Sequence, residues 1–322
     1  MRPSVVVASV RGGQSLDRLL DSLAGQTAEH ELIVIDNGSP EQVVSQACAR
    51  HPDAEVICLE ENAGYSRAVN LGVECASGAA VVLVNDDCIC DPPFVERICA
   101  ALDPGAGVVM AAGVMRDPRD PGLIDSAGME LDRTLLPLDY LNGEPLAMLD
   151  RDVPVPIGPS AAAAAFDRDA FVGAGGFDEA LFAYWEDVDL VLRLVQRGGR
   201  CALASDARGA HEHSATLGSG SRAKNYLMGY GRGYVLRKWS VLSPGRLPAV
   251  LARDLPVCLG QAILDRNLTG IQGRVRGYRA GAAGNRYPAE LLAGTPGRGA
   301  LSSLGRRAAR RRRLRADGSG SR

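Results

Sequence analysis

The stretch AAVVLVNDD, residues 79–87, combines an uninterrupted apolar run with two adjacent carboxylates, Asp86 and Asp87. A run of Val and Leu without polar alternation is typical of a strand buried on both faces of a sheet. Two neighbouring carboxylates repel each other unless a cation lies beside them. Two interpretations follow: either the acids cap the next turn, or they bind a hard divalent cation such as Mg²⁺ or Mn²⁺.

Similar apolar runs precede this stretch, and helix-like segments separate them. The runs are rich in Val and Ile and lie at residues 4–9, 31–36 and 54–60. The segments between them have apolar residues at helical spacing or a Ser-Pro-Glu start, and they lie at residues 15–26, 39–51 and 65–78. This β-α-β-α-β order predicts an α/β, Rossmann-like, mostly parallel sheet flanked by helices.

Composition predicts a soluble protein of a reducing compartment. The chain has 322 residues, of which 46% are hydrophobic, and its eight cysteines are scattered without the paired spacing of a zinc site or a disulfide framework. The N-terminal apolar run is too short for a signal peptide, and no later run approaches about 18 uninterrupted apolar residues. We therefore expect a cytoplasmic protein, with a peripheral position at the inner face of the plasma membrane as a further option.

Charge is distributed unevenly along the chain. Residues 306–315 hold seven arginines and no acid, whereas the rest of the chain carries 29 basic against 38 acidic residues. Such a tail is inert and disordered, binds nucleic acid, or is attracted to anionic lipid at about 1 kcal/mol per residue near the surface. We favour anionic lipid and expect no nucleic-acid partner.

Polar residues cluster where the predicted strands end, which is where open α/β sheets bind ligands. Asp36 begins Asp-Asn-Gly-Ser after the second strand, and Asn85, Asp86 and Asp87 follow the fourth. Further polar groups occur as Asn-Ala-Gly-Tyr at 62–65, Gly-Gly-Phe-Asp-Glu at 175–179 and Glu-Asp-Val-Asp-Leu at 186–190, followed by His211.

This ordered set of motifs resembles the inverting nucleotide-sugar glycosyltransferases of family 2, which have the GT-A fold, and in particular their rhamnosyltransferase-like branch. The resemblance covers residues 4–216. It implies a metal-dependent hexosyltransferase of cell-wall or polysaccharide biosynthesis that uses Mg²⁺ or Mn²⁺. The donor would be a dTDP-, UDP- or GDP-sugar, and the acceptor a glycan, lipid-linked or small-molecule hydroxyl.

The resemblance also implies roles for single residues. Asp87 is the metal ligand and Asp86 a ribose or neighbouring group, while Asp36 binds the nucleotide base. His211 completes the metal shell, with His213 as the alternative. Other donor-binding residues implied by matching positions are Ala8, Ser9, Asn62, Gly64, Arg67, Asn70 and Asn85, although the first strand ends in Ala-Ser where the family usually has Thr-Tyr-Asn.

The catalytic base is expected in the motif around residue 187. An attacking hydroxyl must lose its proton, and Asp187 occupies the family's position for the carboxylate that takes it, with Glu186 as the second candidate. The competing interpretation is that these acids merely favour the positive end of a helix. Tyr184 and Trp185 precede them and are expected to stack on a sugar, whereas Asp189 and Arg193 are expected to be structural.

The domain organisation expected from these patterns has three parts: a catalytic domain at 1–216, a helical extension at 217–300 and a tail at 301–322. Segments 223–242 and 247–265 are predicted helices that either cap the catalytic domain or form an interfacial surface beside a lipid-linked acceptor.

Five alanines at 161–165 stand where the family usually has larger apolar residues, in the segment that would meet the acceptor.

Two other classes of protein compete with this interpretation. A nicotinamide-dependent oxidoreductase shares the sheet, but the first strand lacks the Gly-rich turn of a dinucleotide site, and the Gly-Tyr-Gly-Arg-Gly of 229–233 does not follow a strand. A non-catalytic sugar-nucleotide-binding protein would have the same motifs and would tolerate loss of Asp187.

Overall fold

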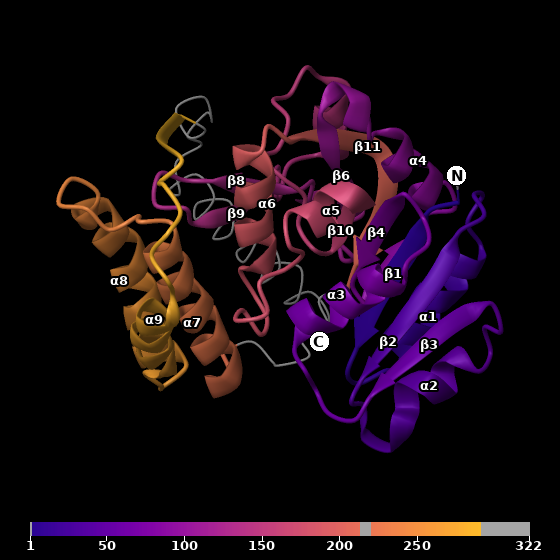
Figure 1. Cartoon of the computed structure of the whole chain (residues 1–322), viewed down its shortest axis with the longest axis horizontal. Coiled ribbons are helices and arrows are strands. Elements are labelled where there is room, and N and C mark those ends of the chain that lie inside the picture. Colours follow the sequence, from indigo (N-terminus) through magenta and orange to yellow (C-terminus); the bar gives the residue numbers. More distant parts are fainter. Residues whose placement is uncertain (1, 213–219, 291–322) are drawn as a thin grey trace, which may run out of the picture.

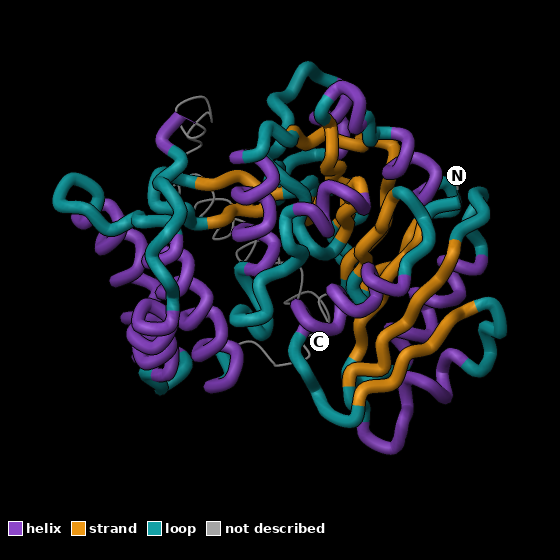
Figure 2. The backbone as a smooth tube through the Cα atoms, viewed as in Figure 1, coloured by secondary structure: helices purple, strands orange, loops and turns teal. Residues whose placement is uncertain are grey.

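The computed structural model of the protein describes residues 2–212 and 220–290. A single curved sheet forms the centre of the molecule, and helices cover both of its faces (Figures 1 and 2). The fold therefore agrees with the α/β architecture predicted from the apolar runs.

The N-terminal half forms the parallel part of the sheet. Its strands, in the order β3-β2-β1-β4, are β1 (Ser4–Ser9), β2 (Glu31–Asn37), β3 (Ala54–Leu59) and β4 (Ala80–Val84). The helices between them are α1 (Gln14–Ala24), the 3₁₀ turn η1 (Pro40–Gln42) with α2 (Val43–Cys48), and α3 (Tyr65–Cys75). These strands and helices lie where the sequence predicted them.

The second half makes the sheet mixed. β10 (Ala163–Asp167) lies antiparallel between β4 and β6 (Val108–Arg116), and β6 pairs in parallel with β11 (Arg200–His211). β5 (Cys88–Cys90) and β7 (Ile124–Ser126) complete the nine strands. Smaller elements are α4 (Phe94–Ala100), η2 (Pro104–Ala106), η3 (Leu146–Asp150), α5 (Arg168–Gly173), α6 (Glu186–Gln196) and the hairpin of β8 (Met129–Leu131) with β9 (Pro137–Asp139).

Alternate residues of the strands enter two hydrophobic cores. Val5 and Val7 point to one face, where α1, α2 and α4 pack, and Val6 points to the other, where α3, α5 and α6 pack. Because both faces are covered, the strands are apolar without alternation.

Three C-terminal helices gather at one end of the molecule, at the left of Figure 1, and α6 lies between them and the sheet. They are α7 (Arg222–Lys238), α8 (Leu247–Leu264) and α9 (Thr269–Ala280). α7 and α9 touch backbone to backbone: a Cβ added at Gly233 would lie 2.0 Å from the Arg274 carbonyl, and one at Gly277 would lie 1.9 Å from that of Tyr230. The glycines of the 229–233 motif thus serve helix packing.

Candidate active site

The acids after β4 lie at the carboxyl edge of the parallel strands. Ser9, the last residue of β1, donates a hydrogen bond of 2.5 Å to the Asp86 carboxylate. Burial and the adjacent charge of Asp87 raise the pKa of Asp86 although the Ser9 hydrogen bond opposes the shift. β1 thus supplies a buried hydroxyl to the first of the two acids, at the position expected for donor binding.

Asp87 forms a short chain of charged groups with two residues from other strands. Nε2 of His211, at the end of β11, lies 3.0 Å from Oδ1 of Asp87, and its Nδ1 lies 3.5 Å from Oδ2 of Asp125 in β7. Burial alone would lower the pKa of His211, but its pairing with Asp125 and Asp87 raises that pKa to about 9. β5 and β11 create this arrangement by pairing His211 opposite Cys88.

The residues around Asp87 fit a divalent cation. Ligand atoms of Asp87, Cys88 and His211 all lie within 4.8 Å of one another. Burial raises the pKa of the Cys88 thiol well above its usual value, and the thiol donates to the Ala162 carbonyl. Mg²⁺ and Mn²⁺ prefer oxygen ligands such as the Asp87 carboxylate, and neutral imidazole is a common metal ligand in proteins. Asp87 and His211 are therefore the suitable pair, and Asp125 would orient the imidazole.

A second acid pair, Glu186 and Asp187, begins α6. Glu186 is 5% exposed and its Oε2 has no hydrogen-bond partner within the described residues. Burial, followed by the charge of Asp187, raises the pKa of Glu186 to about 8. Burial also raises the pKa of Asp187, to about 6, against the hydrogen bonds that the Val188 and Ala161 amides donate. At neutral pH, Asp187 is therefore the ionised member of the pair.

Two tyrosines connect the two acid groups. Tyr65, the first residue of α3, donates to Asn85 over 3.3 Å. Burial raises its pKa well above the usual value, and Glu186, Asp187 and Asp86 add to that shift. The pKa of the half-buried Tyr184 is likewise raised by burial and then by Glu186 and Asp87. The amide of Tyr65 also donates to the Phe182 carbonyl in the loop before α6, so Tyr65 links the end of β4 to the start of α6.

Asp36 and Asn62 stabilise the loops beside this site. The buried Asp36 accepts from the Ser39 amide and from both the amide and the hydroxyl of Ser45. Burial alone would raise the pKa of Asp36, but these hydrogen bonds lower it. The Oδ1 of Asn62 accepts from the amide of Gly64. Gly64 has a φ of 90°, and a Cβ added there would lie 2.6 Å from the Phe182 carbonyl, so no side chain fits.

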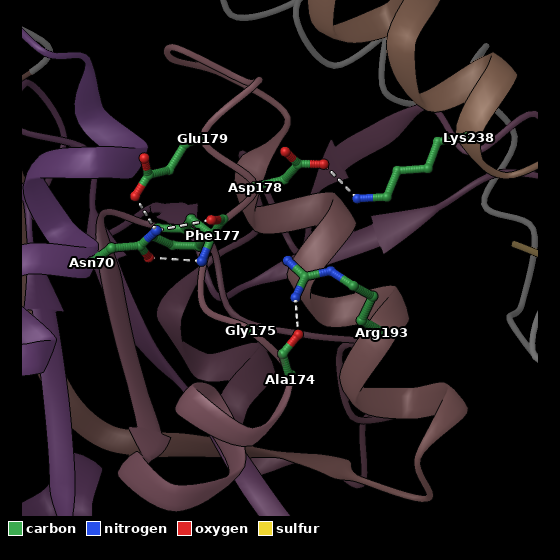
Figure 3. A pocket seen from close by; sticks show the side chains of 8 residues that line it. All are labelled: Asn70, Ala174, Gly175, Phe177, Asp178, Glu179, Arg193 and Lys238. Carbon is green, nitrogen blue, oxygen red and sulfur yellow. Dashed lines mark hydrogen bonds and ion pairs between the residues drawn. The ribbon is translucent and has the colours of Figure 1, made fainter. Parts of the chain in front are cut away.

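Arg67 and Asn70 lie at a different place from the acid pairs. Asn70 holds the loop after α5 by bonding both the amide and the carbonyl of Phe177 (Figure 3). Arg67 lies 3.8 Å from Glu179. Asn70 and Glu179 border a polar pocket of about 400 Å³ in which Lys238 bonds Asp178 and Arg193 bonds the Ala174 carbonyl. A donor-binding role for Arg67 and Asn70 stays a prediction.

The two aromatic residues before α6 differ in exposure. Trp185 is 5% exposed, and its Nε1 donates to the Met228 carbonyl of α7. Gly231 of α7 packs on its ring, where an added Cβ would lie 2.4 Å from Cδ1. Both Tyr184 and Trp185 have left-handed backbone conformations, with φ of 69° and 78°. Tyr184 is thus the aromatic of the two that stays partly exposed, and its acceptor-binding role stays a prediction.

Asp189 has the structural role that its spacing from Arg193 predicted. It is fully buried and accepts from Arg193, Lys238 and the Trp239 indole. α6 and the end of α7 are thereby tied together.

Some features of the site were not found from the sequence, and some predictions lie beyond the described residues. Asp125 and Tyr65 were missed as members of the site. Asp125 stands in no motif that the sequence marks, and Tyr65 was recognised only as the last residue of Asn-Ala-Gly-Tyr. His213 and the tail at 301–322 lie outside the described residues. The choice between His211 and His213 therefore rests on the position of His211 alone.

Residues 4–153 match the family model described as "Glycosyl transferase family 2". The N-acetylglucosaminyl-diphospho-decaprenol L-rhamnosyltransferase of Mycobacterium tuberculosis is 29% identical over 254 residues, which are 66% of this chain and 77% of that protein. Glycosyltransferase AglE of Haloferax volcanii is 26% identical over 116 residues, covering 34% of this chain and 38% of its own.

Solved structures agree on the fold. The crystal structure of GalNAc-T7 with UDP, GalNAc and Mn²⁺ superposes with a TM-score of 0.63 at 14% identity, covering 92% of this chain and 56% of that one. The protein thus spans about half the length of GalNAc-T7. Mannosyltransferase PcManGT from Pyrobaculum calidifontis, in complex with GDP-Man and Mn²⁺, gives a TM-score of 0.51 at 19% identity, covering 91% and 79%.

The curled mixed sheet, with acids at the carboxyl edge of its parallel strands, has the GT-A fold of these two solved structures. More particularly, residues 4–153 match glycosyl transferase family 2, and the chain is similar to an L-rhamnosyltransferase over 66% of its length. Family and fold therefore agree with the resemblance carried by the sequence motifs.

Proposed function

We propose that the protein is an inverting hexosyltransferase that moves rhamnose or another hexose from a nucleoside diphosphate donor to an acceptor hydroxyl. The observation that carries this proposal is the position of Tyr65 between two acid pairs, one after β4 and one at the start of α6. Its hydroxyl donates to Asn85 over 3.3 Å, and its amide donates to the Phe182 carbonyl, in the loop before α6, over 2.7 Å. The acids after β4 are suited to binding the diphosphate and its metal, and the acids of α6 are suited to proton transfer. The site therefore has groups both for the leaving group and for the attacking hydroxyl.

In this proposal Asp87 and His211 hold Mg²⁺ or Mn²⁺, and Asp86 with Ser9 lies beside the donor ribose. When bound, the cation would neutralise the charge of the departing diphosphate. Asp125, 3.5 Å from Nδ1 of His211, fixes which ring nitrogen faces Asp87. These roles place the leaving group at the edge of β4.

Asp187 is the proposed base. As the acceptor oxygen bonds to the anomeric carbon and the bond to the diphosphate breaks, the hydroxyl proton passes to the Asp187 carboxylate. Glu186, whose pKa is raised further, stays protonated at neutral pH and adds no second charge. A single displacement of this kind inverts the anomeric centre, so a β-linked donor such as dTDP-rhamnose gives an α-linked product.

The acceptor class is proposed from the relative that acts on a diphospho-decaprenol-linked sugar. A lipid-linked glycan acceptor would place the protein in cell-wall or polysaccharide synthesis at the cytoplasmic face of a membrane. Tyr184 is the aromatic we expect beside that acceptor, since Trp185 is buried against α7.

Asp187→Asn tests the proposed reaction because the amide keeps the side-chain shape but cannot accept the proton. The chemical step should fall by about 10² to 10⁴ while donor binding persists. Asp169→Asn, which alters an exposed acid in the first turn of α5, is the matched control and should leave the rate unchanged. Lost donor affinity with an unchanged chemical step would refute the base assignment.

Two further measurements separate the competing functions. Product anomeric configuration, read by NMR, must be inverted, because retention excludes a single displacement. A thermal-shift panel of dTDP, UDP, GDP and NAD with and without Mn²⁺ should show metal-dependent stabilisation by a nucleoside diphosphate. A response to NAD instead would favour an oxidoreductase. If Asp187→Asn kept the full biological function of the wild type, a non-catalytic binding protein would be favoured.

A further inference from the structure

Helix α8 is apolar on the side that faces away from the protein. Within the part of the chain that the structure describes, α8 is the one helix that is long and apolar enough to cross a membrane. Its mean hydropathy is 1.4, and only 6% of it is buried. Its exposed residues repeat every four positions along its whole length: Leu247, Leu251, Leu255, Leu259 and Ile263. Leu255 is 54% exposed and Ile263 71%. Soluble helices show the reverse arrangement, with the apolar stripe facing the core.

The polar side chains of α8 face the body of the protein instead. Arg253 pairs with Asp132 over 2.9 Å, and Gln261 donates to Asn225 of α7. Asp254 pairs with the buried Arg232 of α7 over 3.1 Å and with Arg274 of α9 over 3.1 Å. α8 is thus held by its polar side, and its apolar side has no partner within the described residues.

The apolar surface continues onto the next turn and helix. Leu268, Ile271 and Val275 are each more than two-fifths exposed. We refer to these three residues and the exposed apolar residues of α8 together as the apolar surface of α8 and α9. An exposed surface of this extent marks an interaction site.

Charge distinguishes between the candidate occupants of this surface. Residues 221–290, which include α7, α8 and α9, contain twelve Lys and Arg but three Asp and Glu. Residues 1–220 contain fifteen Lys and Arg against thirty-four Asp and Glu. A second copy docking through the same surface would bring two strongly basic regions together, whereas an anionic bilayer attracts them.

We propose that the apolar surface of α8 and α9 inserts into the interface of an anionic phospholipid bilayer, with α8 lying in the membrane plane. The ion pairs of Arg253 and Asp254 with the protein body, midway along α8, favour this orientation over a spanning one. A spanning α8 would break those pairs and carry unpaired charges into hydrocarbon. The proposal stands on this surface alone and does not depend on the proposed reaction.

The first test is vesicle flotation of the full-length protein. The vesicles are a two-to-one mixture of phosphatidylcholine and phosphatidylglycerol. The triple variant Leu251→Ser/Leu255→Ser/Leu259→Ser should lower the partition coefficient about 30-fold or more, because three half-exposed leucines no longer enter the bilayer. Since these side chains are exposed, the variant should keep its circular dichroism and melting temperature.

The matched control is Val155→Ser/Val172→Ser, which removes two apolar side chains that are 63% and 50% exposed and lie outside α7, α8 and α9. It should bind vesicles like the wild type. Equal binding by the triple variant and the wild type would overturn the proposal. So would sedimentation showing that the triple variant only dissociates a dimer and leaves vesicle binding intact, which would assign the surface to a second copy.

The second test measures how deeply each end of α8 enters the bilayer, which distinguishes an in-plane helix from a spanning one. Leu251→Trp and Ile263→Trp lie about 18 Å apart along the helix axis. The native Trp185 and Trp239 are buried at 5% and 0% exposure, so brominated lipids should quench them little. Brominated lipids should quench both introduced tryptophans from the same shallow depth. Depths differing by about the full 18 Å would refute the in-plane orientation, and absence of quenching would refute insertion.

Discussion

Replacing Glu186 with glutamine removes a carboxyl group whose pKa is about 8 in the folded protein, against an ordinary value of 4.5. Between these pH values the folded state keeps a proton that the unfolded chain has lost. Stability from this group is therefore fully present below pH 4.5 and is lost as pH rises toward 8, by about 1.4 kcal/mol per pH unit. From about pH 5 to about pH 7.5 the loss attributable to Glu186 is about 3 kcal/mol.

Glu186→Gln should therefore have a flatter dependence of unfolding free energy on pH than the wild type. Urea unfolding followed by Trp fluorescence, in metal-free buffer at several pH values from about 5 to about 8, measures that difference, and the two curves should separate as pH rises. Glu74→Gln, at an exposed site on α3, is the control for loss of a surface carboxylate. A constant offset between Glu186→Gln and wild type at every pH would mean that Glu186 ionises as it does in water, and the argument from burial would fail.

Three further predictions concern the metal and the base. Asp87→Ala should abolish Mn²⁺-dependent stabilisation by a nucleoside diphosphate in a thermal-shift assay without unfolding the protein, and His211→Ala should weaken it less; full retention by Asp87→Ala would contradict the ligand assignment. Asp125→Asn should lower Mn²⁺ affinity about 10- to 100-fold in a calorimetric titration, and an unchanged affinity would remove its positioning role. Turnover should fall as pH drops through about 6 because Asp187 then takes up a proton, and a pH–rate profile that is flat down to about pH 5 would exclude it as the base.

The parallel half of the fold could be predicted from the sequence because its strands are Val- and Ile-rich and its helices carry start signals. β10 could not, since its row of alanines at 163–165 has little preference for a strand and is placed by β4 and β6 on either side. α8 was predicted as a helix, but the sequence did not predict that its apolar side would face the solvent. Periodicity identifies an apolar stripe without saying whether that stripe meets the core or the solvent.

The prediction of the site had a similar limit. Asp86, Asp87, Glu186 and Asp187 stand next to strand or helix ends, where sequence position implies position in space. The pairing of His211 with Asp125 depends on three separate strands, β5, β7 and β11, whose register no local pattern reveals. Motif order therefore located the acids, and tertiary packing selected their partners.

The contact between Trp185 and α7 sets a limit on how this protein can be recombined with its relatives. A chimera that exchanges everything after residue 216 would replace the Met228 carbonyl and Gly231, which hold the residue directly before the two acids of α6. It would also replace Trp239, whose indole bonds Asp189. Chimeras intended to swap C-terminal helices should keep the native chain through Val241, which is fully buried in the same core, so that the junction falls in the exposed turn before α8.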